Sequence, residues 1–234
     1  DAAAALEAIA WQLLAASPET ATSLGVDTGA HAGLRRVLGD RSADGQRELR
    51  DLLRSGLNSV EALLPGTTAP QLRTNLAVVR SAFSVALDGL ALPYGDVAVG
   101  GWRNTPYVVI QNVGAYLDTP RFLDSDHPIR EAADAEAYLA RLAMFPAQLD
   151  GEHERLRSAG AQGLIAPAFL LDKAIRQMQA TLAEARGGGG RPRWRRRRSP
   201  PSSGGAERGA RAIGAGAIVA AVESDIPVQL GGGI

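Results

Sequence analysis

The sequence contains no cysteine, so it can form neither a disulfide framework nor a thiolate metal site. Aromatic residues make up only 5% of the chain, and the core must therefore be built mainly from Leu, Val, Ile and Ala. No run of about 18 apolar residues occurs, so the sequence predicts no membrane span. The apolar content of 45% is nevertheless enough for a sizeable core in a chain of 234 residues.

Complete catalytic and metal-binding motifs are also missing from the sequence. His153 and Glu154, in GEHERLRSAG (151–160), begin like a zincin helix, but the position that needs a second histidine holds Arg157. The other histidines, His31 and His127, have no partner nearby in the sequence. There is no Gly-x-Ser-x-Gly elbow and no phosphate-binding loop. We therefore assign no catalytic residue, no metal ligand and no cofactor to this chain.

Apolar residues recur at spacings of three and four along most of the chain, a pattern that predicts helices. Between the first two helices, 17–34 is expected to be a Gly- and Thr-rich connection with a helical turn after Pro18. Pro146 is expected to end one helix and start another. The expected helices span 3–16, 44–64, 70–92, 131–145, 146–156 and 167–186, with a weak further candidate at 212–222. The predicted fold class is all-α, an irregular helical bundle.

The stretch 93–128 differs from the rest of the chain because it shows no helical period. It holds four of the 13 prolines. Long irregular stretches are uncommon inside helical domains and are often functional, while aromatic residues argue against disorder. We therefore predict one long ordered loop over about 93–128.

This loop supplies the candidate substrate-binding residues. Its aromatic rings give flat apolar surface and its amide and guanidinium groups supply hydrogen-bond donors, the mixture that lines ligand clefts. The alternative is that the loop caps one end of the bundle, with its amides satisfying buried backbone groups. The candidates are Trp102, Arg103, Asn104, Tyr107, Gln111, Asn112 and Tyr116.

Two pairs of closely spaced carboxylates could in principle act as acid and base. They are Asp124 with Asp126 and Glu152 with Glu154. Carboxylates two positions apart are usually solvent-facing charge, and we interpret both pairs in this way.

Charge is distributed unevenly along the chain. Residues 1–186 carry 22 acidic and 17 basic side chains, whereas residues 187–234 carry 3 acidic and 8 basic side chains. The low-complexity segment 187–206 includes RPRWRRRRSPPSSGG, a composition typical of nucleic-acid-binding arms. However, 24 of the 25 basic residues are Arg, and the segment begins abruptly after an amphipathic pattern. A reading-frame slip in a GC-rich gene, or an insert, explains it better, and we expect no nucleic-acid partner.

Several stretches together resemble one bacterial family, the domain-of-unknown-function family DUF885. They are SPETATSLGVDTG (17–29), LPYGDVAVGGWRNTPYVVIQNVGAYLDTPRFLDSDHPI (92–129), DAEAYLARLAMFPAQLD (134–150) and GLIAPAFLLDKAIRQMQATLAEAR (163–186). The resemblance resumes over 208–230 and covers about four-fifths of the chain. This family is helical and is similar to zinc metallopeptidases.

The resemblance implies the N-terminal part of a zinc-dependent peptidase-like hydrolase. The family's presumed zinc motif, a His-Glu stretch followed by Pro-Gly-His-His, has no counterpart in this sequence. We therefore expect residues 1–186 to flank a substrate cleft for a peptide or small molecule, with 187–206 as the slip or insert and 207–234 as a short helical remnant. Zinc is implied for a full-length relative, and an exported or periplasmic location is favoured. The alternative is a non-catalytic helical binding module with an Arg-rich arm for nucleic acid or anionic surfaces.

Overall fold

The computed structural model describes residues 1–99 and 104–186, and all regular structure in this part is helical. The fold class is therefore all-α, as predicted. None of the described helices combines the length and the apolar content that crossing a bilayer requires. The elements are, in order, α1 (Ala2–Ala16), α2 (Pro18–Ser23), the 3-10 helix η1 (Gly29–Arg36), α3 (Ala43–Leu63), α4 (Pro70–Leu90), α5 (Ala115–Ser125), α6 (Ala132–Ala161) and α7 (Ala168–Arg186).

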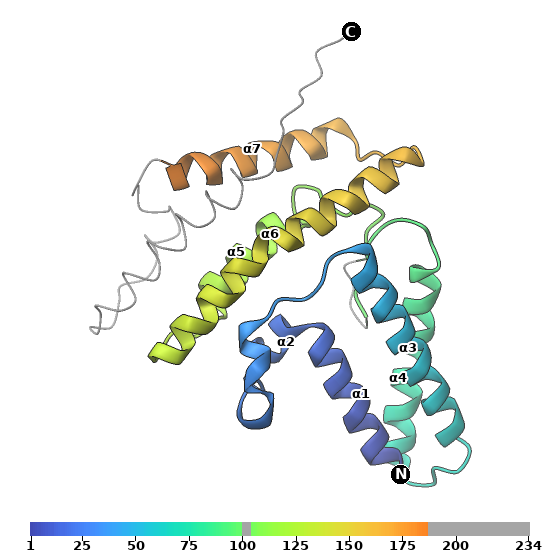
Figure 1. Cartoon of the computed structure of the whole chain (residues 1–234). Helices are drawn as coiled ribbons and strands as arrows, with labels where there is room; N and C mark the ends of the chain where they lie inside the picture. Colours follow the sequence, from blue (N-terminus) through green and yellow to red (C-terminus); the bar gives the residue numbers. More distant parts are fainter. Residues whose placement is uncertain (100–103, 187–234) are drawn as a thin grey trace.

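Helices α1, α3 and α4 form one layer, in which α3 and α4 make an antiparallel hairpin and α1 packs on both (Figure 1). Their core is apolar: Leu53 and Val60 of α3 and Leu76 and Phe83 of α4 are at most 2% exposed. The members of each pair are seven residues apart, two helical turns, so they project from the same face. Burial of each side chain contributes about 1.5–3 kcal/mol.

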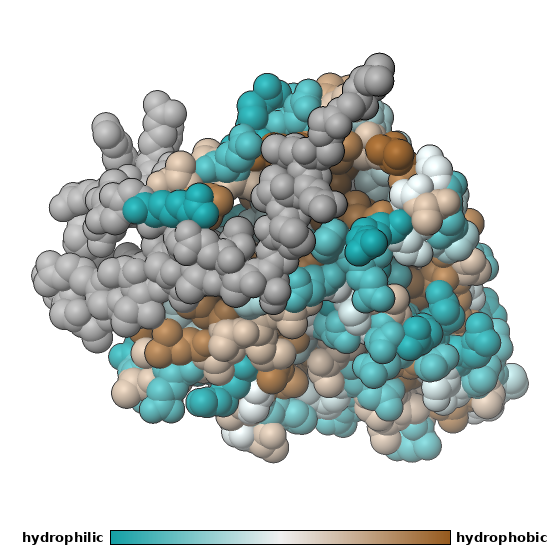
Figure 2. All heavy atoms as spheres, turned by 45° about the horizontal axis from the view of Figure 1, so that its top comes forward, coloured by the Kyte–Doolittle hydropathy of each residue, from teal (hydrophilic) through white to brown (hydrophobic). Residues whose placement is uncertain are grey.

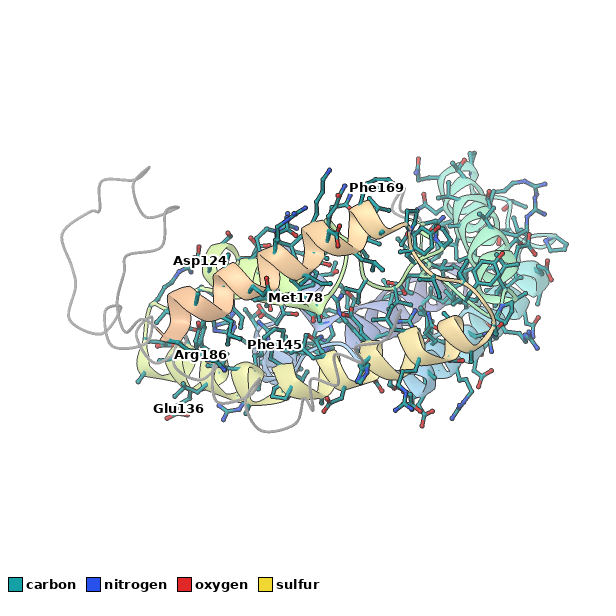
Figure 3. All side chains as sticks on the ribbon, turned by 90° about the horizontal axis from the view of Figure 1, so that it is seen from above. Asp124, Glu136, Phe145, Phe169, Met178 and Arg186 are labelled. Carbon is teal, nitrogen blue, oxygen red and sulfur yellow. The ribbon has the colours of Figure 1, made fainter. Side chains whose placement is uncertain are left out.

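Helices α5 and α6 form the second layer. Phe122 and Leu123 of α5 pack with Leu142 and Phe145 of α6, and Leu38 from the connection before α3 completes this smaller core. The short elements α2 and η1 join the layers, because η1 contacts α6 while α2 contacts α1. Helix α7 then runs back along α6 in the opposite direction (Figure 3).

The predicted helix break at Pro146 is wrong, because α6 continues through this residue as one helix of 30 residues. A proline inside a helix costs about 3 kcal/mol, since it removes one N–H and crowds the preceding turn. On both sides of it, α6 buries large side chains: Leu142 and Phe145 before, Gln148 and Glu152 after. Packing on this long face outweighs the local preference.

The predicted loop over 93–128 is too long, because its last third contains helix α5. Ala115, Thr119, Phe122 and Leu123 of this helix are buried at offsets of zero, four, seven and eight, a regular helical face. Thr119 and Pro120 interrupt the apolar pattern, so the helical spacing of the buried residues was not evident from the sequence. The irregular segment between α4 and α5 is therefore 91–114.

The other predicted helices agree with the structure to within two residues at most ends. The N-cap of α3 is Ser42, whose hydroxyl accepts from the Gly45 N–H. The connection 17–34 is more helical than predicted, because it holds α2 and most of η1. The candidate helix 212–222 and the segments 187–206 and 207–234 lie outside the described residues, so the proposed division of the chain stays a prediction.

Candidate functional site

Two short backbone pairings shape the irregular segment before α5. Asp96 and Thr105 exchange N–H···O bonds of 2.8 and 3.2 Å, and Ile110 and Val113 exchange bonds of 3.0 and 3.2 Å. Each pairing satisfies backbone groups that a loop would otherwise leave to water. The described part of the predicted loop is therefore ordered by its own hydrogen bonds as well as by packing.

Among the predicted binding residues that the structure describes, Tyr107 lines a pocket. The pocket has a volume of about 110 Å³ and lies between this segment, the end of α6 and the start of α7. A water molecule takes about 30 Å³ of liquid, so the space suits one apolar side chain of a ligand. Apart from the Tyr107 hydroxyl, the lining side chains are apolar and include Val108, Leu156, Leu164 and Leu171.

The other candidates that the structure describes do not line this pocket. The side-chain oxygen of Asn104 accepts a 2.8 Å bond from the Ala98 N–H, so this residue stabilises the turn. Asn112 is exposed. In the part of the chain that the structure describes, Gln111 Oε1 is buried without a hydrogen-bond partner. Trp102 and Arg103 lie outside the described residues.

Tyr116 connects the segment to α7. Its hydroxyl oxygen lies 2.9 Å from the Ile110 carbonyl oxygen and 2.8 Å from the side-chain oxygen of Gln177. Burial raises the pKa of Tyr116, and the negative charges of Asp118 and Glu152 add to this rise. Tyr116 therefore stays a neutral hydrogen-bonding group at physiological pH and positions α7 against the start of α5.

Glu152 anchors this segment to α6, although its spacing from Glu154 indicated a solvent-facing charge. Glu154 is exposed, but Glu152 is only 3% exposed. Its Oε1 atom accepts a 2.8 Å bond from Arg41, and its two oxygens lie 2.9 and 2.8 Å from the Ala115 N–H. The carboxylate therefore caps the first turn of α5 and holds the connection before α3.

Burial raises the pKa of Glu152, while the charge of Arg41 and the hydrogen bonds from Arg41 and Ala115 act in the opposite direction. The hydrogen bonds from Arg41, before α3, and from Ala115, at the start of α5, therefore favour the charged carboxylate. The other acidic pair agrees with the sequence-based interpretation, since Asp124 and Asp126 are both exposed.

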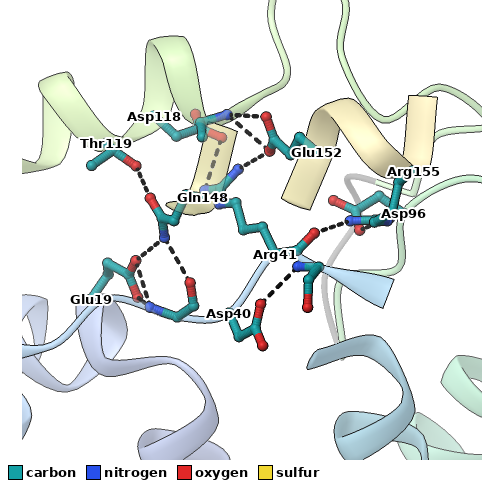
Figure 4. A network of polar contacts seen from close by, with 12 residues as sticks. Glu19, Asp40, Arg41, Asp96, Asp118, Thr119, Gln148, Glu152 and Arg155 are labelled. Atoms are coloured by element: carbon teal, nitrogen blue, oxygen red, sulfur yellow. Dashed lines mark hydrogen bonds and ion pairs between the residues drawn. The ribbon is translucent and has the colours of Figure 1, made fainter. Parts of the chain in front are cut away.

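Figure 4 shows that one face of α6 organises the surrounding segments. Gln148, Glu152 and Arg155 follow one another at offsets of four and three and are all buried. The Gln148 amide donates a 2.8 Å bond to the Gly39 carbonyl and accepts a 2.7 Å bond from Thr119. Arg155 donates a 2.7 Å bond to the carbonyl of residue 95. These three residues lie three, seven and ten positions after the buried Phe145, so their spacing in the sequence already places them on the same face of the helix.

Gly151 lets this face approach the connection before α3. A Cβ atom at this position would lie 2.8 Å from the backbone nitrogen of Ser42 and 2.9 Å from its Cα. Both contacts are with backbone, which cannot swing away as a flexible side chain can. The close approach brings Arg41 within reach of Glu152.

A second buried polar cluster joins α6 to α2 and η1. Its centre is Arg141, which is 0% exposed. Beside it, Arg35 bonds Asp27 at 3.0 Å and Asp134 at 2.7 Å. Burial lowers the pKa of Arg141 to about 10. Arg141 donates to the carbonyls of Pro18, Leu34 and Val37, to the Thr22 hydroxyl and to His127 Nδ1.

These contacts fix the protonation state of His127. A guanidinium can only donate, so Nδ1, 2.8 Å from Arg141, must accept. The ring is therefore neutral, with its proton on Nε2, which donates a 3.0 Å bond to the Asp134 carbonyl. Burial lowers the pKa of His127, and the charge of Arg141 lowers it further.

The described residues do not fit the zinc ion that the family resemblance implies. No group of three metal-ligating side chains comes together in this part of the chain. The His127 ring nitrogens are engaged as above, His31 stacks on Trp11 at 3.4 Å, and Glu152 is held by Arg41. We derive no step through a metal from these residues.

An all-α scaffold with an ordered aromatic segment and two buried polar clusters defines the described part of this molecule. The chain belongs to the family described as "Bacterial protein of unknown function (DUF885)", whose sequence model matches residues 18–224. The matched range includes most of 208–230, where the resemblance resumes after the low-complexity segment. No curated protein matches the chain.

Proposed function

We propose that the described helices form one wall of the substrate cleft of a peptidase-like hydrolase, and that they bind substrate without supplying the catalytic groups. The proposal rests on one observation: Tyr107 lines an apolar pocket on a segment that buried Glu152 fixes to the longest helix. The reaction class is part of the proposal and comes from the resemblance to zinc metallopeptidases noted in the sequence.

A cleft wall must hold its binding groups in place before substrate arrives, because ordering them on binding would cost affinity. Two features meet this need. The Ile110–Val113 pairing sets the shape of the segment, and the Glu152 carboxylate holds its end at the first turn of α5. Substrate then places an apolar side chain against Tyr107 in this pocket.

The test is peptide binding by the full chain. Fluorescein-labelled peptides that carry one Leu or Phe in a Gly/Ser background would be titrated and followed by fluorescence anisotropy. Tyr107→Ala should weaken binding about tenfold, the equivalent of about 1.4 kcal/mol for a lost aromatic contact. The all-Gly/Ser peptide should bind the wild type and this variant equally weakly.

Tyr94→Ala is the matched control, because Tyr94 is 40% exposed in the same segment and does not line the pocket. It should leave binding unchanged. Equal losses in the two variants, or no preference for the apolar peptides, would contradict the proposal. Thermal melts of both variants check that each is folded.

A further inference from the structure

Helix α7 carries an apolar stripe that the described residues cover only in part. The stripe consists of Leu171, Ala174, Ile175, Met178 and Leu182, at successive offsets of three, four, seven and eleven from the first. Ala174 is 3% exposed, but Ile175 and Met178 are 49% and 36% exposed. A helix of this kind normally gains most of its stability by burying such a stripe.

The described contacts hold α7 along one edge of the stripe. Ala174 is buried there, and the Gln177 amide meets the Tyr116 hydroxyl from α5. The rest of the stripe is open at Ile175 and Met178, which are partly exposed. We call Ile175 and Met178 the open edge.

The figures agree with this arrangement. Figure 3 shows Met178 on the side of α7 that faces α6, with Phe145 across from it. Figure 2 brings the α7 side of the molecule forward and shows hydrophobic residues among the hydrophilic ones. Exposed apolar residues on one helix face mark an interaction surface more often than isolated ones do.

The sequence after α7 contains a segment of matching chemistry. Residues 212–222, AIGAGAIVAAV, carry no charge and consist only of Ala, Gly, Ile and Val. The family match over 18–224 includes both α7 and this segment, so the two belong to one matched unit. We propose that residues 212–222 of the same chain pack on the open edge of α7.

The connecting chain is long enough for this contact. Residues 187–211 separate α7 from the segment, and a chain of 25 residues can span at most about 80–90 Å. Helix α7 has 19 residues and is therefore about 28 Å long. The segment can thus return along the whole helix. The small Ala and Gly residues let it approach closely, while Ile218 and Val222, four apart, supply apolar contact area.

Maleimide labelling of single cysteines tests the proposal, because the chain has no cysteine of its own. Met178→Cys would be labelled in the full chain and in a chain ending at residue 211. The truncation should speed labelling at least tenfold if 212–222 covers this position. Ala180→Cys is the matched control, because Ala180 is exposed and lies about 200° further round the helix. Its rate should not change.

Equal rates for Met178→Cys in the two chains would overturn the proposal. So would protection that depends on protein concentration, because a second copy would then be the occupant. A cross-link tests the contact directly: with a short bis-maleimide, Met178→Cys with Ala217→Cys should react within one chain at least tenfold faster than Ala180→Cys with Ala217→Cys. Equal cross-linking of the two pairs would also contradict the proposal.

Discussion

Two junctions in this molecule are held by opposite chemistry. The α3–α4 hairpin is held by large apolar side chains such as Leu53 and Phe83, whereas α6 is held to α2 and η1 by Arg141, Asp134 and their partners. Apolar contacts are non-directional and tolerate changes of similar volume. A buried polar cluster is stable only when every member has its partner, because each unpaired group bears the full cost of desolvation. The two junctions should therefore respond differently to conservative substitutions.

The largest effect is expected for Arg141→Ala. The change leaves three carbonyls, the Thr22 hydroxyl and His127 without their buried donor. The free energy of unfolding, measured by urea denaturation, should fall by about 3–5 kcal/mol. Arg141→Lys should also destabilise strongly, because an ammonium group cannot reach the same set of acceptors.

Arg157→Ala is the control for this prediction, since Arg157 is exposed on the same helix. Its effect should stay within about 0.5 kcal/mol. A loss below about 1 kcal/mol for Arg141→Ala would show that the polar cluster does not hold the junction.

A somewhat smaller effect is expected for Leu53→Ala, at about 3 kcal/mol, because the substitution leaves a cavity in the apolar core. Leu53→Met, in contrast, should cost less than about 1.5 kcal/mol. The comparison between the junctions is sharpest here. If Arg141→Lys proved as mild as Leu53→Met in urea denaturation, the distinction between apolar and polar junctions would fail.

The smallest effect concerns pH and the neutral ring of His127. Because burial holds its pKa below the ordinary value of 6.5, the unfolded chain takes up a proton first as the pH falls. The contribution of His127 is fully present above pH 6.5 and declines below that value. Charged groups of three elements face this site, namely Arg141 and Asp134 of α6, Arg35 of η1 and Asp27 after α2.

Melting temperatures of the wild type between pH 7.5 and 5 should therefore decline, and His127→Gln should flatten this decline. The glutamine amide can accept from Arg141 but does not gain a charge in this range. His153→Gln, on the exposed face of α6, is the matched control and should keep the wild-type profile. A decline that is identical in all three proteins would assign the pH dependence to other groups.

The parts that could be predicted from sequence follow the same division. Leu53, Val60, Leu76 and Phe83 repeat at helical spacing, so helices α3 and α4 were each visible in the pattern alone. The local rule for proline failed at Pro146, because packing along the whole of α6 outweighs one lost hydrogen bond. Local structure is predictable where a single face of a single helix carries the signal.

The candidate site was predicted less well, for a physical reason. The partners of Glu152 and Arg141 lie more than 30 residues away in most cases, as with Arg41 at a separation of 111. A charged residue gives no sign in the sequence of a distant partner that will neutralise it. Tyr107 was predicted because aromatic residues in an irregular segment stand out by composition. Tyr107 lines a pocket, but its role in binding substrate, like the roles of the other candidates, stays a prediction.

The close approach at Gly151 has a consequence for how this protein can change over time. Any side chain there would push α6 away from the connection that carries Arg41 and so separate Arg41 from Glu152. A library of all single variants, selected for folded protein, should therefore recover glycine almost alone at position 151. The next exposed positions, 153 and 154, should accept nearly every residue. Neighbouring positions on one helix would thus differ in how freely they change: position 151 is restricted by contact with the backbone of Ser42, whereas positions 153 and 154 can vary.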